Sequence, residues 1–331
     1  MSETVSLAHW QQQPLPWQAA ALDQLALRRE QNQLPHALLI SGAEGLGKAR
    51  FAESLASLLL CASPRNYRAC GHCGACQVAQ GGGHGDYRWL APAPDKRAIG
   101  IDAVRAMLGF IQQTSGYGSH KVLAIAPAEA MTTAAANALL KTLEEPAGNS
   151  ALLLVSHRPS DLPATVRSRC QQVVLPTPTL EASLRWLQDE LTGTDAAATG
   201  IPQETLISAL AAASHRPLAA FDLIVSGNLE AVQTRAQLIR GLLTAHVSAA
   251  EASAALASEP PEAMLSALYQ SLSQRLASAS AAELAQFGPK SFVASDAIVN
   301  MLAAVRAGVN PAKDILYAEA CRHVAGLWSE R

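Results

Sequence analysis

Short apolar runs alternate with helix-like stretches through the first half of the chain. Five of these runs carry almost no charge, as strands do when both faces of a parallel sheet are buried. The expected strands are Ala37–Ile40, Tyr87–Leu90, Val122–Ala126, Leu152–Ser156 and Val173–Leu175. The expected helices are Phe51–Leu60, Ile101–Gln113 and Ala134–Glu145, with Pro146 ending the last. The alternation predicts an α/β core built on a parallel sheet.

The pattern changes after Pro176-Thr177-Pro178, where strand-like runs disappear. Helices are then expected over Leu180–Leu191, Pro202–Ala213 and Pro217–Val225, followed by a break at Gly227-Asn228. From Leu229 onward, regularly spaced leucines predict an all-α bundle with breaks near Pro260-Pro261 and Gly288-Pro289. We therefore expect three domains, over residues 1–176, 177–227 and 228–331.

Composition narrows the class of protein. Hydrophobic residues make up 49% of the 331 residues and aromatic ones only 5%, because alanine and leucine dominate, and this favours helices. A formal net charge of −2 argues against a strong autonomous nucleic-acid binder, which normally carries a basic surplus. Met1–Gln13 is polar without the basic start and apolar run of a secretory signal, and no stretch approaches a membrane span. We expect a cytoplasmic protein with no membrane contact.

A phosphate-binding loop follows the first expected strand. Residues 42–49 read Gly-Ala-Glu-Gly-Leu-Gly-Lys-Ala and precede a helix, as in a P-loop. Such a loop wraps phosphates with backbone N–H groups, its lysine neutralises their charge, and the next residue supplies a hydroxyl to Mg²⁺. That next residue is Ala49, which has no side-chain oxygen. The candidate nucleotide-binding residues are Gly42, Gly45, Gly47 and Lys48. Weak binding of ATP without turnover stays open.

A second requirement of ATP hydrolysis is missing after the third expected strand. Active P-loop ATPases place acidic residues there to hold Mg²⁺ and orient the attacking water. This chain has Ala126-Pro127 instead, and Glu129 further on is expected to be a solvated loop carboxylate. Together with Ala49, this predicts a nucleotide-binding fold that hydrolyses nothing itself.

Four cysteines form a candidate metal site after the P-loop helix. They are Cys61, Cys70, Cys73 and Cys76. Four thiolates with such short spacers can close a tetrahedron around Zn²⁺ and leave no open position, which is typical of a structural zinc. The alternatives are reduced core cysteines, a redox pair, or His72 or His84 as a substitute ligand. Cys170 and Cys321 lie far away in sequence and are not expected to be ligands.

Two further blocks carry a resemblance to a known family. Residues 137–146 read Asn-Ala-Leu-Leu-Lys-Thr-Leu-Glu-Glu-Pro, and residues 162–170 read Leu-Pro-Ala-Thr-Val-Arg-Ser-Arg-Cys. With the four-cysteine insert and the helical second half, they resemble bacterial clamp-loader subunits of the AAA+ class over essentially the whole chain. In that family the tau/gamma motor subunits have a complete P-loop, whereas delta-prime subunits have a degenerate one. Ala49 and Ala126-Pro127 are similar to the delta-prime pattern.

The resemblance implies an AAA+ P-loop core, a small helical lid and a C-terminal collar that joins a hetero-pentameric ring. The partners it implies are the tau/gamma motor subunits and the delta subunit, with the sliding clamp and primed DNA reached through the complex. It implies a part in DNA replication as a component of DNA polymerase III, a DNA-directed nucleotidyltransferase, without independent ATPase activity.

The resemblance also implies a role for Arg169. In clamp loaders the arginine of the Ser-Arg-Cys block reaches across a subunit boundary to the γ-phosphate of ATP held by the neighbour. Its planar cation would act there as an arginine finger in trans. The alternative is a local salt bridge at a strand edge, and Arg167 is expected to be a solvated charge. Motor subunits also have a phosphate-sensing lid arginine, whose place falls at Pro217 beside Arg216.

Two other functions stay open on the sequence. One is an active AAA+ clamp-loader ATPase with unusual metal coordination, which Ala49 and Ala126 disfavour. The other is a zinc-dependent DNA-binding module, which the charge balance and the lack of a basic helix beside the cysteines disfavour.

Overall fold

The computed structural model describes residues 13–81, 83–117, 120–192, 201–309 and 311–328. The polar N-terminal segment, on which part of the localisation prediction depends, lies almost entirely outside these residues. The chain divides into two compact units, Met1–Asp222 and Leu223–Arg331, and each is described by itself. The boundary falls inside helix α9 (Pro217–Val225), and the division into three domains stays a prediction.

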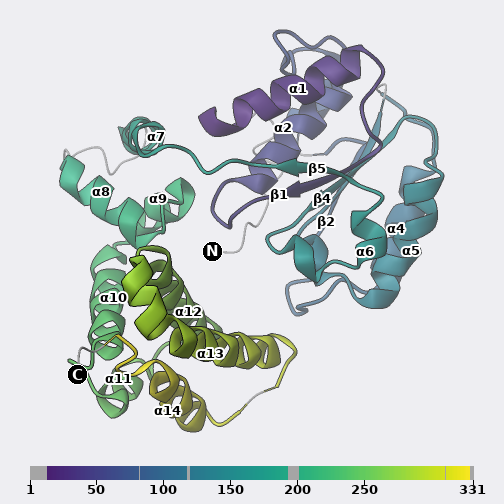
Figure 1. The fold of residues 1–331 in the computed structure, drawn as a ribbon. Helices are drawn as coiled ribbons and strands as arrows, with labels where there is room; N and C mark the ends of the chain where they lie inside the picture. Colours follow the sequence, from purple (N-terminus) through teal and green to yellow (C-terminus); the bar gives the residue numbers. More distant parts are fainter. Residues whose placement is uncertain (1–12, 82, 118–119, 193–200, 310, 329–331) are drawn as a thin grey trace. The chain divides into compact units, whose positions relative to one another are not determined.

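A five-stranded parallel sheet forms the centre of the first unit (Figure 1). Its strands are β1 (Ala37–Ser41), β2 (Tyr87–Leu90), β3 (Lys121–Ile125), β4 (Ser150–Val155) and β5 (Gln171–Val174). The order across the sheet is β2-β3-β4-β1-β5, and every pairing is parallel. β1, β3 and β4 are buried along their whole length, which is why their sequences are continuous apolar runs.

Helices cover both faces of this sheet. The covering helices are α1 (Ala19–Glu30), α2 (Lys48–Leu60), α4 (Ile101–Ile111) and α5 (Thr133–Glu144). Alternate residues of a strand point to opposite faces, so Leu38 of β1 packs with α1 and α2, whereas Leu39 packs with α4 and α5. The predicted α/β fold class with a parallel sheet is confirmed, and each predicted strand lies within two residues of an observed one.

The remaining elements connect these layers and complete the unit. They are η2 (Pro16–Gln18), α3 (Gly74–Gln80), η3 (Ala128–Ala130), η4 (Pro159–Asp161), α6 (Ala164–Arg167), α7 (Leu180–Thr192) and α8 (Gln203–Ala212). The predicted helices after the sheet correspond to α7, α8 and α9. The P-loop lies between β1 and α2, and Arg169 lies between α6 and β5.

Helices are the only regular elements in the described residues of the second unit. Its helices are α10 (Leu229–Leu243), α11 (Ala249–Ala255), α12 (Pro261–Ala277), α13 (Ala281–Arg306) and α14 (Lys313–Val324). Leu242, Leu265 and Tyr317 belong to its single apolar cluster, so the predicted helical bundle is confirmed. None of the helices in the described part of the chain is long and apolar enough to cross a membrane.

One predicted break is wrong, because α13 continues through Gly288-Pro289. A proline inside a helix has no N–H for the carbonyl four residues earlier, here that of Ala285. Both Pro289 and Ala285 lie on the exposed side of α13, where water can replace the missing hydrogen bond. The helix therefore tolerates this proline.

Candidate functional site

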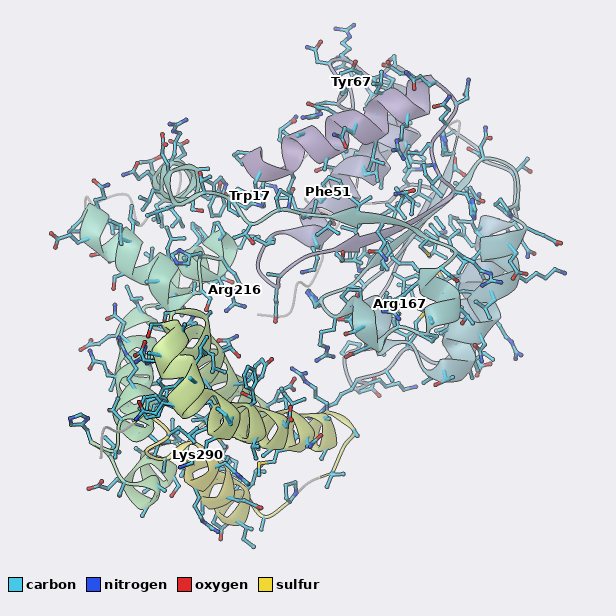
Figure 2. The ribbon with its side chains drawn as sticks, in the orientation of Figure 1. Trp17, Phe51, Tyr67, Arg167, Arg216 and Lys290 are labelled. Atoms are coloured by element: carbon cyan, nitrogen blue, oxygen red, sulfur yellow. The ribbon has the colours of Figure 1, made fainter. Side chains whose placement is uncertain are left out.

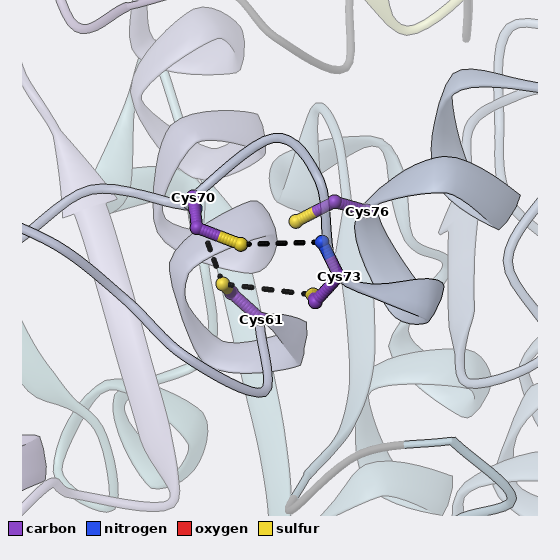
Figure 3. Close-up of side chains that lie close together, drawn as sticks. All are labelled: Cys61, Cys70, Cys73 and Cys76. Carbon is purple, nitrogen blue, oxygen red and sulfur yellow. Dashed lines mark hydrogen bonds between the residues drawn. The ribbon is translucent and has the colours of Figure 1, made fainter.

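The four cysteines meet at one point of the first unit (Figure 3). Cys61 directly follows α2, Cys70 and Cys73 lie on the loop before α3, and Cys76 lies on α3. The loop turns sharply at Gly71, whose φ of 82° is a left-handed conformation that favours glycine. All four Sγ atoms lie within 4.8 Å of one another, so the fold brings together the whole predicted set.

The sulfur positions fit a tetrahedral metal ion. With Zn–S bonds of about 2.3 Å, neighbouring sulfurs of a tetrahedron are about 3.8 Å apart. Cys61 Sγ lies 3.9 Å from Cys73 Sγ. The backbone N–H of Cys70 donates to Cys61 Sγ at 3.2 Å, and that of Cys73 donates to Cys70 Sγ at 3.3 Å. Such bonds favour the thiolate form that binds metals, so these four side chains can hold a metal ion.

The thiols differ in how readily they ionise. The backbone N–H of His72, helped by that of Cys73, lowers the pKa of Cys70 to about 5. Burial raises the pKa of Cys61 and of Cys76. Because metal ligands must be deprotonated, a metal ion has to displace protons from these two buried thiols when it binds.

The other candidate ligands lie elsewhere. Among the described residues, the cluster of possible metal ligands contains the four cysteines and neither histidine. His84 is buried, and its Nδ1 accepts the backbone N–H of Asp86 at 3.0 Å. His72 is exposed beside the cluster. Cys170 and Cys321 are each buried in an apolar core, one in each unit.

The lysine of the P-loop is turned into the loop itself. Lys48 is fully buried, and its Nζ donates to the carbonyl oxygens of Gly42 at 3.1 Å and Ala43 at 2.8 Å. The next residue, Ala49, is also buried, and it offers no ligand for Mg²⁺. The loop's own carbonyl groups thus occupy two of the three N–H donors that a P-loop lysine would offer to phosphate.

Residues before α1 close the P-loop from one side. The Nε2 of Gln18 donates to the carbonyl oxygens of Leu46 and Gly47, both at 2.8 Å, and the Nε1 of Trp17 donates to that of Leu46 at 3.1 Å. Gly47 has a φ of 76°, and a Cβ built on it would lie 2.4 Å from Cδ1 of Leu15. Leu15 and Gln18 therefore pack directly on the glycine backbone of the loop.

The start of α9 lies against the P-loop from another direction. A Cβ built on Gly45 would lie 3.4 Å from the Cβ atoms of Arg216 and Ala219, which is close van der Waals contact. The side chain of Arg216, labelled in Figure 2, donates from Nε to the carbonyl oxygen of Ala213 at 2.7 Å. These contacts reduce the open space over the loop.

The expectation for Glu129 is wrong. Its side chain is half-buried, and Oε1 accepts the backbone N–H groups of His157 at 3.0 Å and Arg158 at 3.2 Å. Glu129 thus ties η3 to the chain that follows β4, a structural task that a solvated carboxylate would not perform. Its neighbours Ala126 and Pro127 provide no acidic group at the end of β3.

Arg169 lies at the surface in a local ion pair. Its Nε donates to Oε1 of Glu144 at 2.8 Å, and its Nη2 lies 2.5 Å from the same oxygen. Its Nη1 donates to the carbonyl oxygen of Thr165 at 3.0 Å. The side chains of Arg169 and Glu144 are 36% and 52% exposed. Figure 2 labels Arg167 at the end of α6, two residues earlier.

A buried ion pair anchors the loop before β3, and no sequence pattern indicated it. Lys121 Nζ lies 3.0 Å from Oδ1 of Asp86, and both side chains are almost fully buried. Asp86 also accepts the backbone N–H groups of Gly116 and Tyr117. Burial alone would raise the pKa of Asp86, but these N–H groups and the Lys121 ammonium more than offset it and lower the pKa. The pair joins residues that are far apart in sequence, which is why it was missed.

The sequence matches a protein family and several known proteins. The profile of the family described as "DNA polymerase III, delta subunit" matches residues 17–179. The chain is 44% identical to DNA polymerase III subunit delta' of Pseudomonas aeruginosa, over 69% of this chain and 65% of the relative. It is 36% identical to the Escherichia coli protein of the same name, over 68% of this chain and 65% of the relative.

These matches do not cover the full length of the relatives. The matched part spans 65% of the length of each of these two relatives, which is just under two thirds. A solved gamma subunit-related protein from Thermotoga maritima aligns over 93% of this chain and 98% of its own at 16% identity, but a TM-score of 0.46 is too low to add support. The conclusion rests on the sequence relatives: the chain belongs to the family of DNA polymerase III delta-prime subunits.

Proposed function

We propose that this protein is a non-hydrolysing subunit of the DNA polymerase III clamp loader. In this proposal it braces the ring and supplies Arg169 in trans, as an arginine finger, to ATP held by the adjacent ATPase subunit. The complex would load the sliding clamp on primed DNA during replication in the cytoplasm. Membership in the family of delta-prime subunits supports the assignment to this complex.

The observation that carries the proposal is the setting of Arg169. Its guanidinium lies at the surface, while the chain's own P-loop holds Lys48 on the loop carbonyls. An arginine that acts on a neighbour's nucleotide needs exposure and a firm base, and it needs no nucleotide in its own subunit. A guanidinium spreads its charge over the oxygens of a transferring phosphoryl group and so lowers the barrier to hydrolysis.

The P-loop is proposed to be a packed structural turn. Lys48 bonds to the loop, Leu15 and Gln18 pack on Gly47, and Ala49 gives no hydroxyl to Mg²⁺. The glycines Gly42, Gly45 and Gly47 then serve the turn and its close packing. In this reading the chain does not bind ATP tightly.

The metal of the cysteine cluster is proposed to be a structural zinc. Four thiolates around one tetrahedral position leave no open site for a substrate, so the ion would stabilise the fold without catalysing a reaction. It would fasten the end of α2, through Cys61, to α3, through Cys76. The ion would then hold the insert in place after α2.

The partners are proposed from the same family membership. A tau/gamma subunit of Haemophilus influenzae is 34% identical to this chain over 148 residues, which is 45% of the chain and 21% of that protein. Subunits that share a fold can pack side by side in a ring, as the proposed assembly with tau/gamma and delta requires. The helical second unit is the proposed collar that joins the ring.

The test is ATP turnover by a loader reconstituted from motor subunits, delta and this chain, stimulated by clamp and primed DNA. Arg169→Ala should reduce turnover in a complex that still assembles, and Arg167→Ala, at a half-buried arginine two residues away, should not. Assembly is verified for each variant by size-exclusion chromatography. Equal turnover by wild type and Arg169→Ala would leave this chain as a scaffold without a finger.

A further inference from the structure

The hydrogen bonds of Arg169 use only part of its guanidinium. A guanidinium has five N–H groups in one plane. Glu144 accepts from Nε and Nη2. Thr165 accepts from Nη1, with a longer contact from Nη1 to Ser168 Oγ at 3.4 Å, and that hydroxyl itself donates to the Thr165 carbonyl at 3.2 Å. Both acceptors of Nη1 therefore lie close together.

The outer edge of the guanidinium remains available. Nη1 and Nη2 each have a second hydrogen, and these two hydrogens point in parallel away from the side-chain stem. Beyond Glu144, Thr165 and Ser168, Arg169 has no hydrogen-bond partner among the described residues. Two parallel N–H donors are the fork with which arginine binds phosphate oxygens in a bidentate manner.

The backbone next to Arg169 is held in place by buried side chains. Leu162, just before α6, and Val166, within α6, are almost fully buried in the apolar core between the sheet and the helices α4 and α5. Thr165 therefore offers its carbonyl oxygen from a fixed backbone. Glu144 is the last residue of α5, and α5 is covered by the same core.

The Glu144 carboxylate is not explained by a large contribution to the stability of the fold. Ion pairs with both partners about this exposed contribute little to folding. The C-terminal end of a helix carries a partial negative charge, so a carboxylate at the last position of α5 is unfavourable unless a cation lies nearby. The arrangement is better explained by what it does to Arg169.

We propose that Glu144 is a positioning residue for Arg169. It holds the inner edge of the guanidinium, so that the outer edge faces away from the protein, ready for the terminal phosphate of a nucleotide bound by the neighbouring subunit. This inference rests on the proposed arginine-finger role. Holding a long side chain in place before the phosphate arrives removes part of the ordering cost from the reaction step.

The experiment compares Glu144→Ala, Glu144→Gln and Glu145→Ala in the reconstituted loader, with kcat and KM for ATP measured for each. Glu144→Ala should lower kcat about tenfold with little change in KM, since a finger that acts in the transition state affects kcat. Glu144→Gln keeps an acceptor oxygen and should recover most of the loss. Glu145→Ala removes the adjacent exposed carboxylate and should behave as wild type.

A double variant tests the positioning role of Glu144 separately from the proposed arginine-finger role of Arg169. If Glu144 acts through Arg169, Glu144→Ala should change nothing further in an Arg169→Ala background. A large effect of Arg169→Ala with none of Glu144→Ala would overturn the positioning role and leave the finger standing. No effect of Arg169→Ala would overturn both. A higher kcat for Glu144→Ala would mean that Glu144 competes with the phosphate, which contradicts the inference.

A spectroscopic measurement on the isolated chain tests the pairing without any partner. The Arg169 Nε–H resonance, assigned by its loss in Arg169→Lys, should exchange slowly with water in wild type. It should exchange quickly in Glu144→Ala and stay slow in Glu145→Ala. An Nε–H that exchanges equally fast in wild type and Glu144→Ala would overturn the inference.

Discussion

Lys48 Nζ lies 2.8 Å from the carbonyl oxygen of Ala43, inside the very loop from which a P-loop lysine reaches its phosphate. A second bond, to Gly42, uses another of its three donors. The loop thus satisfies its own lysine. Two causes for weak nucleotide binding follow, the missing hydroxyl at Ala49 and the packed loop, and an experiment can separate them.

Restoring the hydroxyl should not restore nucleotide binding. We expect both wild type and Ala49→Thr to bind Mg²⁺-ATP with a Kd above about 1 mM, because Leu15, Gln18 and Lys48 still fill the loop. Isothermal titration calorimetry on the isolated chain measures this. A micromolar Kd for Ala49→Thr would show that the loop opens readily and that only the metal ligand is missing.

The cysteine cluster should contain one zinc ion per chain after purification without chelators. Cys73→Ser should lose the zinc and lower the melting temperature, because the proposed ion would link α2 to α3. Cys170→Ala, outside the cluster, should keep the zinc. Atomic absorption gives the metal content, and a full zinc complement in Cys73→Ser would contradict the proposed ligand set.

Zinc affinity should fall as the pH is lowered. Burial raises the pKa of Cys61 and Cys76, whereas the pKa of Cys70 is about 5. As the pH falls, protons therefore compete with the metal for Cys61 and Cys76 at a higher pH than they do for Cys70. Competition with a chromophoric chelator between about pH 8 and pH 6 measures the trend. An affinity that did not change over this range would argue against thiolate ligands.

The Asp86–Lys121 pair should matter to folding far more than the surface pairs. Asp86→Asn leaves the Lys121 ammonium buried without its counter-charge, and we expect a loss of about 3 kcal/mol in the free energy of unfolding. Asp95→Asn, at an exposed aspartate, should change it by less than about 0.5 kcal/mol. Urea unfolding at neutral pH measures both changes. An unfolding free energy of Asp86→Asn close to that of wild type would show that the pair does not stabilise the fold.

The Asp86–Lys121 pair should also make the free energy of unfolding depend on pH, with stability lost in acid. The pKa of Asp86 is lowered in the folded chain from an unfolded value of about 3.9, so its contribution is complete above that value. The contribution is lost only as the pH falls below it. The difference in unfolding free energy between wild type and Asp86→Asn should therefore be constant from about pH 8 to pH 5 and shrink in strong acid. A difference that already shrank near pH 6 would contradict this assignment.

The elements that sequence reasoning found are those in which local pattern and tertiary burial agree. β1, β3 and β4 are buried on both faces, so their sequences are apolar without interruption. α1 was not predicted, because Leu22, Leu25 and Ala26 form only a narrow buried stripe and no side chain caps its start. α13 was predicted to break because the sequence around Pro289 does not show that this proline and Ala285 lie on the exposed side of the helix.

The site residues also include some that local sequence predicts and others that it does not. The cysteine cluster was predictable because its ligands come from one short segment with fixed spacing, and the structure brings them together. The long-range partners of Arg169 and of the P-loop backbone were not, since Glu144 is 25 residues from Arg169 and Gln18 is 28 residues from the Leu46 carbonyl to which it donates. Such contacts depend on the tertiary fold, which a single sequence does not display.

The most direct test of the central claim is single-turnover hydrolysis of ATP preloaded on the reconstituted loader, in wild type and in Arg169→Ala. Loss of an arginine finger slows hydrolysis by about 10³-fold or more. We therefore predict that Arg169→Ala converts part of the fast hydrolysis, the fraction bound at the site next to this chain, into a very slow phase while the amount of bound ATP is unchanged. An unaltered fast phase of full amplitude, in a complex shown to contain the variant, would contradict the proposal that Arg169 acts in its neighbour's active site.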